Sequence, residues 1–254
     1  MLIDTHSHIY SEEFNGEIDE VVKRAVKNGV QKVLLPNIDS SSIKMMLDLA
    51  NRYKQVCFPM MGIHPTSVKE DFEEELELVE YWLGKRKFYG IGEVGIDLYW
   101  DDTYREEQEY VFKRQLNYAQ KLKLPLSIHT RDSFELTHQI IKTGFQKKVK
   151  GVFHSFTGSV EQAKEAIDLG FKIGVGGIVT FKNSGMDKII AQLDPHDIVL
   201  ETDSPYLSPT PLRGKRNESA YLVHVAAKVA EIYDLPLTEI SEITTQTANR
   251  LFFE

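Results

Sequence analysis

The chain has 254 residues, of which 42% are hydrophobic and 27% are charged, a composition that excludes a disordered or fibrous protein. Its formal net charge of −8 argues against a surface that attracts nucleic acid nonspecifically, although nucleic acid is not excluded as a substrate. The one cysteine, Cys57, excludes an internal disulfide, and no apolar run is long enough to cross a bilayer. Because the sequence opens on an apolar run rather than a basic leader, we expect a cytoplasmic protein.

Short apolar runs rich in β-branched residues alternate along the chain with segments of helical periodicity. The predicted strands are 2–6, 32–37, 56–64, 89–96, 124–129, 150–156, 171–179 and 198–203. The predicted helices include 18–29, 41–53, 72–87, 104–122 and 160–169, with a closing pair near 219–233 and 238–252. Parallel strands joined by crossover helices, in about 250 residues, favour an α/β fold of the (β/α)8 TIM barrel type, with residues 1–254 as a single domain. An open doubly wound sheet is the main alternative.

Polar residues and glycines mark several expected helix ends. Asp132 is a plausible cap for the helix after the fifth strand, and Ser159 for the helix that follows. Glycine stands where helices are expected to stop, at Gly29, Gly144 and Gly170. We therefore expect helix boundaries at these residues.

Side chains that can bind a metal stand at the polar ends of the predicted strands. They are His6, His8, Glu93, His129, His154 and Asp203. The C-terminal ends of the strands of a TIM barrel open onto one face, where active sites form, so we expect these side chains to meet. Separate burial of each polar group would require a separate partner, whereas one shared metal cluster serves them all. Because side chains alternate along a strand, His6 and His8 would point to the same face and hold one ion.

Residues Gly90 to Gly95 match the dinucleotide-binding pattern G-x-G-x-x-G. The match lies inside a predicted strand rather than in a turn that opens a helix, so we reject a dinucleotide site there. We interpret these glycines as positions where backbones approach closely beneath the metal site. Glu93 stands at their centre, and its two oxygens could bridge two ions. The alternative is a carboxylate that forms a salt bridge in a loop.

The series HxH, Glu, His, His, Asp and the blocks around it resemble the metal-dependent amidohydrolase superfamily and, more closely, its TatD family of DNases. The blocks are DTHSH (4–8), GIHP (62–65), IGEVGID (91–97), LPLSIHTRD (124–132), VFHSFTGS (152–159), GVGGIVTFK (174–182), LETDSPYL (200–207) and RGKRNE (213–218). They cover nearly the whole chain in a fixed order. The chain departs from the family at Ser219, where proline is common, and in the stretch from Leu98 to Trp100.

The resemblance implies two divalent metal ions, bound by the six side chains named above, with Glu93 bridging. Mg or Mn is implied for activity, and the mixed imidazole and carboxylate donors also suit Zn or Ni. Two ions about 3.5 to 4 Å apart can activate a shared water for attack on a phosphodiester. We expect Asp203 to orient that water and accept its proton, with Glu93 as the second catalytic residue. Glu201 either assists them or pairs with a neighbouring Lys or Arg.

Other side chains at strand ends could bind a DNA substrate, single-stranded DNA included. The candidates are His64, Arg131, Tyr206 and Arg213. His64 and Arg131 could hold phosphate oxygens, although His64 could instead form a structural hydrogen bond before Pro65. Tyr99 and Trp100 could stack on a base or belong to the core. We interpret Lys215 as solvated surface.

The leading hypothesis is therefore a metal-dependent deoxyribonuclease that hydrolyses DNA phosphodiester bonds. The alternative is a metal-dependent hydrolase of a small amide, ester, lactone or phosphoester. The basic loop from Arg213 to Arg216, and a glutamate rather than a carboxylatable lysine at position 93, weigh against it. A third hypothesis, a binding or scaffold protein, leaves the complete ligand set unexplained. No obligate protein partner is evident in the sequence.

Overall fold

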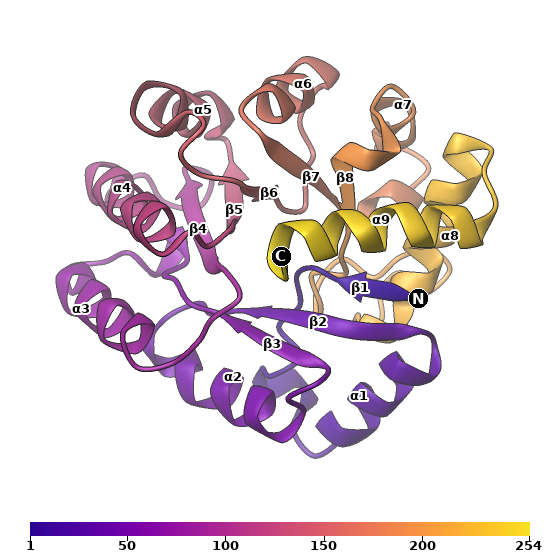
Figure 1. The fold of residues 1–254 in the computed structure, drawn as a ribbon, viewed down its shortest axis with the longest axis horizontal. Coiled ribbons are helices and arrows are strands. Elements are labelled where there is room, and N and C mark those ends of the chain that lie inside the picture. The colour runs from indigo at the N-terminus through magenta and orange to yellow at the C-terminus, as the bar shows by residue number, and fades with distance from the viewer.

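Parallel strands alternate with helices around a central ring in the computed structural model, which describes residues 1–254 (Figure 1). The strands are β1 (Leu2–Asp4), β2 (Val30–Pro36), β3 (Cys57–Met60), β4 (Ile91–Asp97), β5 (Leu126–Arg131), β6 (Gly151–Phe153), β7 (Phe171–Val175) and β8 (Ile198–Leu200). They pair in two runs, β1-β2-β3 and β4-β5-β6-β7-β8. Each pair is parallel, as the alternation of strands and helices predicts.

Hydrogen bonds join these two runs at both of their edges. Between β3 and β4, the Met61 amide donates to the Gly90 carbonyl at 3.1 Å. Between β1 and β8, the Thr5 amide donates to the Leu200 carbonyl at 3.0 Å. The ring is therefore closed, which confirms the (β/α)8 barrel and excludes the open doubly wound sheet. That the whole chain forms one domain stays a prediction.

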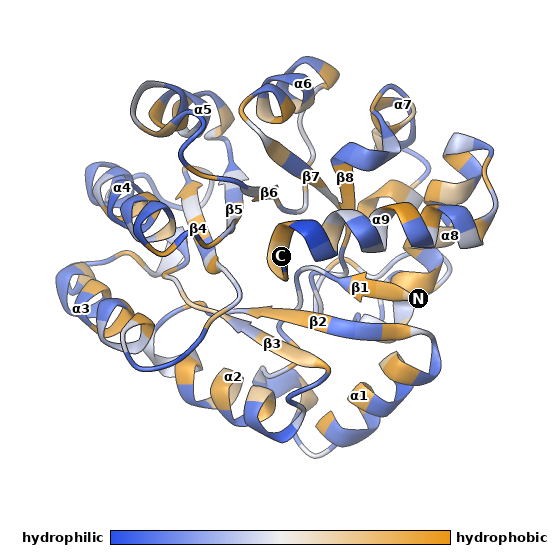
Figure 2. Ribbon diagram, in the orientation of Figure 1, coloured by the Kyte–Doolittle hydropathy of each residue, from blue (hydrophilic) through white to orange (hydrophobic).

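Helices α1 to α8 lie around the outside of the ring, and α9 lies across one end of it (Figure 1). They are α1 (Ile18–Lys27), α2 (Ser40–Arg52), α3 (Phe72–Leu83), α4 (Arg105–Leu122), α5 (Phe134–Ile140), α6 (Val160–Asp168), α7 (Met186–Ile190), α8 (Leu222–Tyr233) and α9 (Leu237–Phe252). Figure 2 shows hydrophobic patches alternating with hydrophilic ones along these helices, as expected of amphipathic helices on a barrel. The short helix α7 is the one that the sequence did not predict. No helix has the length and apolar character needed to cross a membrane.

Three of the five predicted helix boundaries are confirmed. Gly29 and Gly170 adopt positive φ, +86° and +93°, directly after α1 and α6. The Ser159 side chain accepts a hydrogen bond from the Gln162 amide and caps α6. In each case the residue satisfies backbone groups that the helix itself leaves unpaired.

The predictions at Asp132 and Gly144 are wrong. The residue before α5 is Ser133, and its hydroxyl is bonded to the Ile96 carbonyl and the Arg131 amide rather than to the helix. Asp132 has a φ of +53° and turns the chain between β5 and α5. Helix α5 stops at Ile140, and Gly144 lies in the wider turn that follows, where it caps nothing.

The two ends of the barrel differ in chemistry. Helix α9 covers the end at which the strands begin, and a small apolar cluster seals it. That cluster consists of Ile3, Leu34, Phe58, Met60, Val152, Val199, Ala248, Leu251 and Phe252. The polar side chains predicted to bind metal lie at the opposite end. The barrel is therefore a packed core that supports a polar site on one face only.

Gly95 provides a test of this packing. It stands opposite His129 in the pairing of β4 with β5, has a φ of +143°, and an added Cβ would lie 2.0 Å from the His129 carbonyl oxygen. We expect Gly95→Ala to lower the free energy of unfolding by about 3 kcal/mol, since backbone strain and overpacking act together. Urea denaturation measures the change. Gly84→Ala is the matched control, because Cβ there would make ordinary contacts at 3.5 Å. Equal stability of the two variants would contradict the described strand pairing.

Candidate metal centre

Glu93 lies at the centre of the site, and both of its carboxylate oxygens face imidazole nitrogens. Its Oε2 lies 3.1 Å from His6 Nε2 and 3.3 Å from His8 Nε2. Its Oε1 lies 2.7 Å from His154 Nε2 and 3.0 Å from His129 Nδ1. Donor atoms therefore form two groups, one on each oxygen. A carboxylate in this position has the geometry to bridge two cations.

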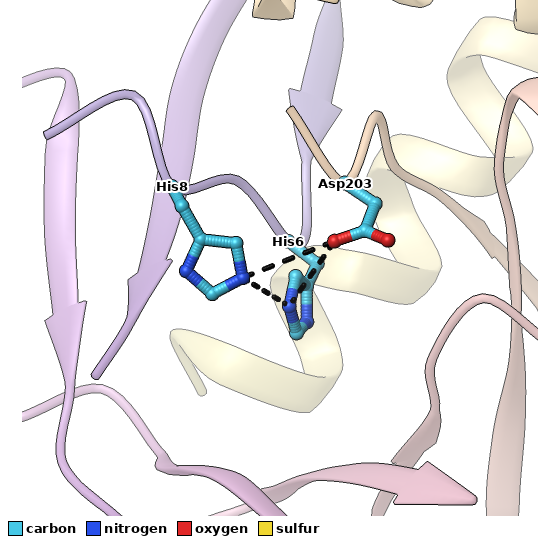
Figure 3. A group of neighbouring side chains, drawn as sticks. All are labelled: His6, His8 and Asp203. Carbon is cyan, nitrogen blue, oxygen red and sulfur yellow. Dashed lines mark hydrogen bonds and ion pairs between the residues drawn. The ribbon is translucent and has the colours of Figure 1, made fainter. Parts of the chain in front are cut away.

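Asp203 completes the group at Oε2. Its Oδ1 lies 3.8 Å from the Nε2 atoms of both His6 and His8, and Figure 3 shows the three side chains turned toward one another. The histidines follow β1 and the aspartate follows β8, and the Asp203 amide donates to the His6 carbonyl at 2.9 Å. The sequence placed His6 and His8 on one strand. In the structure they lie just beyond β1, and the closing edge of the ring brings Asp203 to them.

Tyr10 fixes the hydrogen on the His8 ring. The Tyr10 hydroxyl donates to the Pro36 carbonyl at 2.6 Å, so it can only accept from His8 Nδ1, which lies 3.0 Å away. Nδ1 therefore carries the ring hydrogen, and Nε2 presents its lone pair to Glu93. An imidazole held in this tautomer by a hydrogen-bond partner is typical of metal ligands.

Asp97 orients His129 in the same way through the opposite nitrogen. The carboxylate Oδ2 of Asp97 lies 2.9 Å from His129 Nε2. Burial would raise the pKa of Asp97, but the hydrogen bond to His129, the charge of that ring and the Tyr99 and Trp100 amides together outweigh burial and lower that pKa. An ionised carboxylate only accepts, so His129 Nε2 carries a hydrogen. Burial would lower the pKa of His129, but Asp97 and Glu93 together raise it, and once the ring is neutral its Nδ1 lone pair faces Glu93. This is the carboxylate–histidine arrangement found behind metal ions.

Glu201 stands behind His154. Its Oε1 lies 3.7 Å from His154 Nδ1, and neither that nitrogen nor Glu201 Oε2 has a hydrogen-bond partner. A Cβ on Gly174 would lie 2.5 Å from Glu201 Oε2, so only glycine leaves room for the carboxylate. The alternative in which Glu201 pairs with Lys or Arg is wrong, because its carboxylate contacts His154 and the Ser155 amide instead.

The site attracts positive charge. Burial would raise the pKa of Glu93, but the imidazoles of His154, His64 and His6 outweigh burial and hold it well below its ordinary value. Burial would likewise lower the pKa of His154, but Glu93 and Glu201 hold it well above its ordinary value. Burial lowers the pKa of His6 and raises that of Asp203 to about 6. The carboxylates therefore favour a positive charge beside them, and a metal ion that binds there would displace the proton from His154.

The donor set fits divalent cations. In their neutral tautomers, His8 Nε2 and His129 Nδ1 point lone pairs at Glu93 oxygens only 3.3 and 3.0 Å away. Acceptors that face one another at hydrogen-bond distance in a buried site need a proton or a cation between them. Nitrogen and oxygen donors mixed in this way suit Mn, Zn, Ni or Mg. The structure thus brings together all six predicted side chains, and their assignment as ligands stays a prediction.

His64 also reaches the cluster, with its Nε2 3.2 Å from Glu93 Oε1. The Thr66 amide donates to His64 Nδ1 at 3.1 Å, so in the neutral ring Nε2 carries the hydrogen. Burial lowers the pKa of His64, which favours the neutral ring. His64 therefore points a donor, not a lone pair, into the site. The structural hydrogen bond expected for His64 is present, and its binding of phosphate oxygens stays a prediction.

The three other predicted substrate-binding residues have exposed side chains, with Arg131 the last residue of β5 and the other two on the loop after β8. Arg131, at the end of β5, lies over the Tyr99 ring, and Arg213 lies over the Phe181 ring at 4.3 Å. Tyr206 is 53% exposed and its amide donates to the Asp203 carbonyl, which places it beside the cluster. None of the three forms an ion pair.

Sequence reasoning missed the side chains that orient the histidines: Tyr10, Asp97 and Ser127. Ser127 Oγ lies 2.9 Å from His6 Nδ1. Spacing could have found two of them, since Tyr10 is two residues from His8 and Ser127 two from His129. Asp97 is the hardest to predict, because the positive φ of Gly95 interrupts the alternation between Glu93 and Asp97.

Comparison with known proteins identifies the family. The family model described as TatD related DNase matches residues 3–253. The chain belongs to this TatD family. A Bacillus subtilis relative named as an uncharacterized metal-dependent hydrolase, YabD, is 36% identical over 99% of each chain. The crystal structure of the Escherichia coli TatD homologue YjjV superposes with a TM-score of 0.93 at 30% identity, over 99% of this chain and 97% of that one.

A hydrolase of the TatD family from Entamoeba histolytica, at 22% identity, shares the fold with a TM-score of 0.86 over 99% of this chain and 98% of that one. Together these matches make this TatD family member a metal-dependent hydrolase. The printed names of these relatives identify no substrate.

Removal of the Tyr10 hydroxyl tests the described orientation of His8. We expect Tyr10→Phe to weaken binding of Mn²⁺ or Zn²⁺ by about 10-fold or more, because loss of a hydrogen bond that fixes a metal-binding histidine has effects of that order. Isothermal titration calorimetry on metal-stripped protein measures it. Tyr233→Phe is the control, since that hydroxyl bonds the Ile190 carbonyl instead. Unchanged affinity in Tyr10→Phe would show that His8 is not oriented through Tyr10.

Proposed function

We propose that this protein is a metal-dependent deoxyribonuclease that hydrolyses DNA phosphodiester bonds. The observation that best supports the proposal is the two-sided donor set on Glu93, with Asp203 on one side and His64 on the other. Displacement at phosphorus develops charge on the entering and leaving oxygens, and a pair of cation positions can stabilise both. The family description as a related DNase points to the same substrate.

The proposed ligands are His6, His8, Glu93, His129, His154 and Asp203. Two divalent ions held there, whether Mg, Mn, Zn or Ni, would supply positive charge to the phosphate and acidify a water. The residues of the chain itself would then act on that water and on the substrate. Tyr10, Asp97 and Ser127 orient His8, His129 and His6 through hydrogen bonds, and Glu201 lies 3.7 Å behind His154.

Asp203 is the proposed proton acceptor for the attacking water. Glu93 would contribute one carboxylate oxygen to each of the two donor groups. His64 points an N–H into the cluster, where it can donate to a phosphate oxygen. Arg131 carries a planar set of donors without a carboxylate partner, which suits bidentate contact with a phosphate. Tyr206 and Arg213 stand on the loop after β8 and can contact the DNA beyond the cleaved bond.

A cytoplasmic location forms part of this proposal. The single cysteine, Cys57, is buried and has no partner for a disulfide. Burial raises the pKa of its thiol to about 12, so it is unreactive as a thiolate at neutral pH. A protein without disulfides is consistent with a reducing compartment.

Cleavage of single-stranded DNA tests the proposed function. We expect metal-stripped protein to be inactive and to regain activity with Mg²⁺ or Mn²⁺, because the facing donors need cations. Asp203→Asn should lower kcat by about 100-fold or more, the usual contribution of a positioned proton acceptor. Oligonucleotides labelled separately at each end report the rate and the direction of shortening. Asp168→Asn, an exposed aspartate at the end of α6, is the control.

Two results would contradict the deoxyribonuclease. One is the absence of cleavage with every metal tested. The other is a lactone, amide or small phosphoester that is hydrolysed orders of magnitude faster than DNA. In the second case the proposed metal centre would be retained, and the small molecule would replace DNA as the proposed substrate. Cleavage by Asp203→Asn at the normal rate would instead remove Asp203 from the mechanism.

A further inference from the structure

The loop between β4 and α4 exposes two adjacent aromatic rings. Trp100 is 68% exposed, more than any other large hydrophobic residue of the chain, and Tyr99 is 53% exposed. Their rings are nearly perpendicular, at 86°, with centroids 5.0 Å apart. The interpretation of these residues as core is therefore wrong. Large aromatic rings exposed together beside a polar site are typical of a binding surface.

Arg131 lies against both rings. Its guanidinium carbon is 3.8 Å from the Tyr99 centroid and 4.9 Å from the Trp100 centroid. No carboxylate lies within ion-pair distance of it, and its side chain donates no hydrogen bond in the described structure. The aromatic rings hold the guanidinium in place, while its N–H groups stay available for an anionic ligand.

The aromatic loop is tied directly to the metal centre. Asp97 Oδ1 accepts hydrogen bonds from the Tyr99 amide at 3.0 Å and the Trp100 amide at 3.4 Å. The other oxygen of the same carboxylate faces His129 Nε2 at 2.9 Å. Arg131 follows His129 by two residues on β5, so the two side chains share one face about 6.6 Å apart along the strand. The loop is therefore connected to the metal centre through Asp97, and Arg131 lies on the same strand as His129.

Cavities flank the loop on both sides. One of about 670 Å³ is lined by Tyr99 and Arg131 together with Phe134 and Phe156. The other, of about 240 Å³, is lined by Trp100 and contains Lys69. The first cavity thus offers an aromatic face and a cationic group without an ion-pair partner, whereas Lys69 in the second lies 3.7 Å from Asp101 Oδ2. Planar rings attached to phosphates are the ligand class that matches this combination.

We propose that Tyr99, Trp100 and Arg131 form a nucleobase subsite, in which an unpaired base stacks on the aromatic loop and Arg131 binds the phosphate beside it. This inference rests on the proposed function, since it assigns the nucleotide next to the cleaved phosphodiester. A base inside a duplex has both faces covered by its neighbours, so the subsite takes a base from a single-stranded end.

Trp100 itself reports occupancy of the subsite without any cleavage. In Trp82→Phe, Trp100 is the sole tryptophan. We expect its fluorescence to be quenched when a phosphorothioate dT oligonucleotide, which resists hydrolysis, is added to the Mg²⁺-loaded protein. An abasic oligonucleotide of the same length keeps the charge but lacks the rings. It should quench at least about 10-fold more weakly at equal concentration, since one base–aromatic stack has an effect of that order.

Kinetics provide the second measurement. Trp100→Ala should lower kcat/KM for single-stranded DNA by about 10-fold, mainly through KM, and should leave the rate on the abasic oligonucleotide unchanged. Tyr81→Ala is the matched control, because Tyr81 is 54% exposed and lies on the outer helix α3. We expect the control to cleave both oligonucleotides at the normal rate.

The two proposals fail separately. The nucleobase subsite would be overturned, and the deoxyribonuclease left intact, by two results together. Trp100→Ala would cleave DNA as fast as the unchanged protein, and DNA would not quench Trp100 in Trp82→Phe. Quenching by the dT oligonucleotide without cleavage of any DNA would support the subsite and overturn the proposed activity. If neither quenching nor cleavage occurred, both proposals would be overturned.

Discussion

One buried carboxylate surrounded by imidazoles is the interaction on which the rest of this site depends. Glu93 would be costly to bury in its ionised form if it were alone, yet nitrogens of five histidines lie within 3.3 Å of its two oxygens. Hydrogen bonds from behind turn the lone pairs of His8 and His129 toward Glu93 rather than away from it. Such an arrangement favours a bound positive charge. A divalent cation suits it best, because one ion can be coordinated by several donors at once.

The two ends of the barrel have different functions, one in stability and the other in forming the site. The end closed by α9 is apolar and holds the strands together, whereas the opposite end collects polar side chains from strands that are far apart in sequence. Close packing beneath the site depends on glycine at two positions, Gly95 against the His129 carbonyl and Gly174 against the Glu201 carboxylate. The rejected dinucleotide pattern around Glu93 is thus a packing feature of β4, as the sequence indicated.

Much of the fold and the cluster could be predicted from sequence because both depend on repeated local patterns. Apolar runs that end in His, Glu or Asp identify strands and their polar ends together, so the six proposed ligands needed no knowledge of contacts. What failed depends on tertiary contacts. Asp132 has the features of a helix cap in the sequence, but it lies in a turn and Ser133 precedes α5. The sequence also left open whether Tyr99 and Trp100 stack on a base or belong to the core, and only their exposed rings beside Arg131 exclude the core.

The most direct test of the central claim is anomalous diffraction from crystals of the protein soaked in Mn²⁺. We expect two anomalous peaks, one on each side of the Glu93 carboxylate. His6, His8 and Asp203 should surround one peak, and His129 and His154 should lie near the other. Both peaks should vanish after treatment with a chelator. Peaks located elsewhere, or no peak beside Glu93 at saturating Mn²⁺, would contradict the claim that this cluster is built to hold cations.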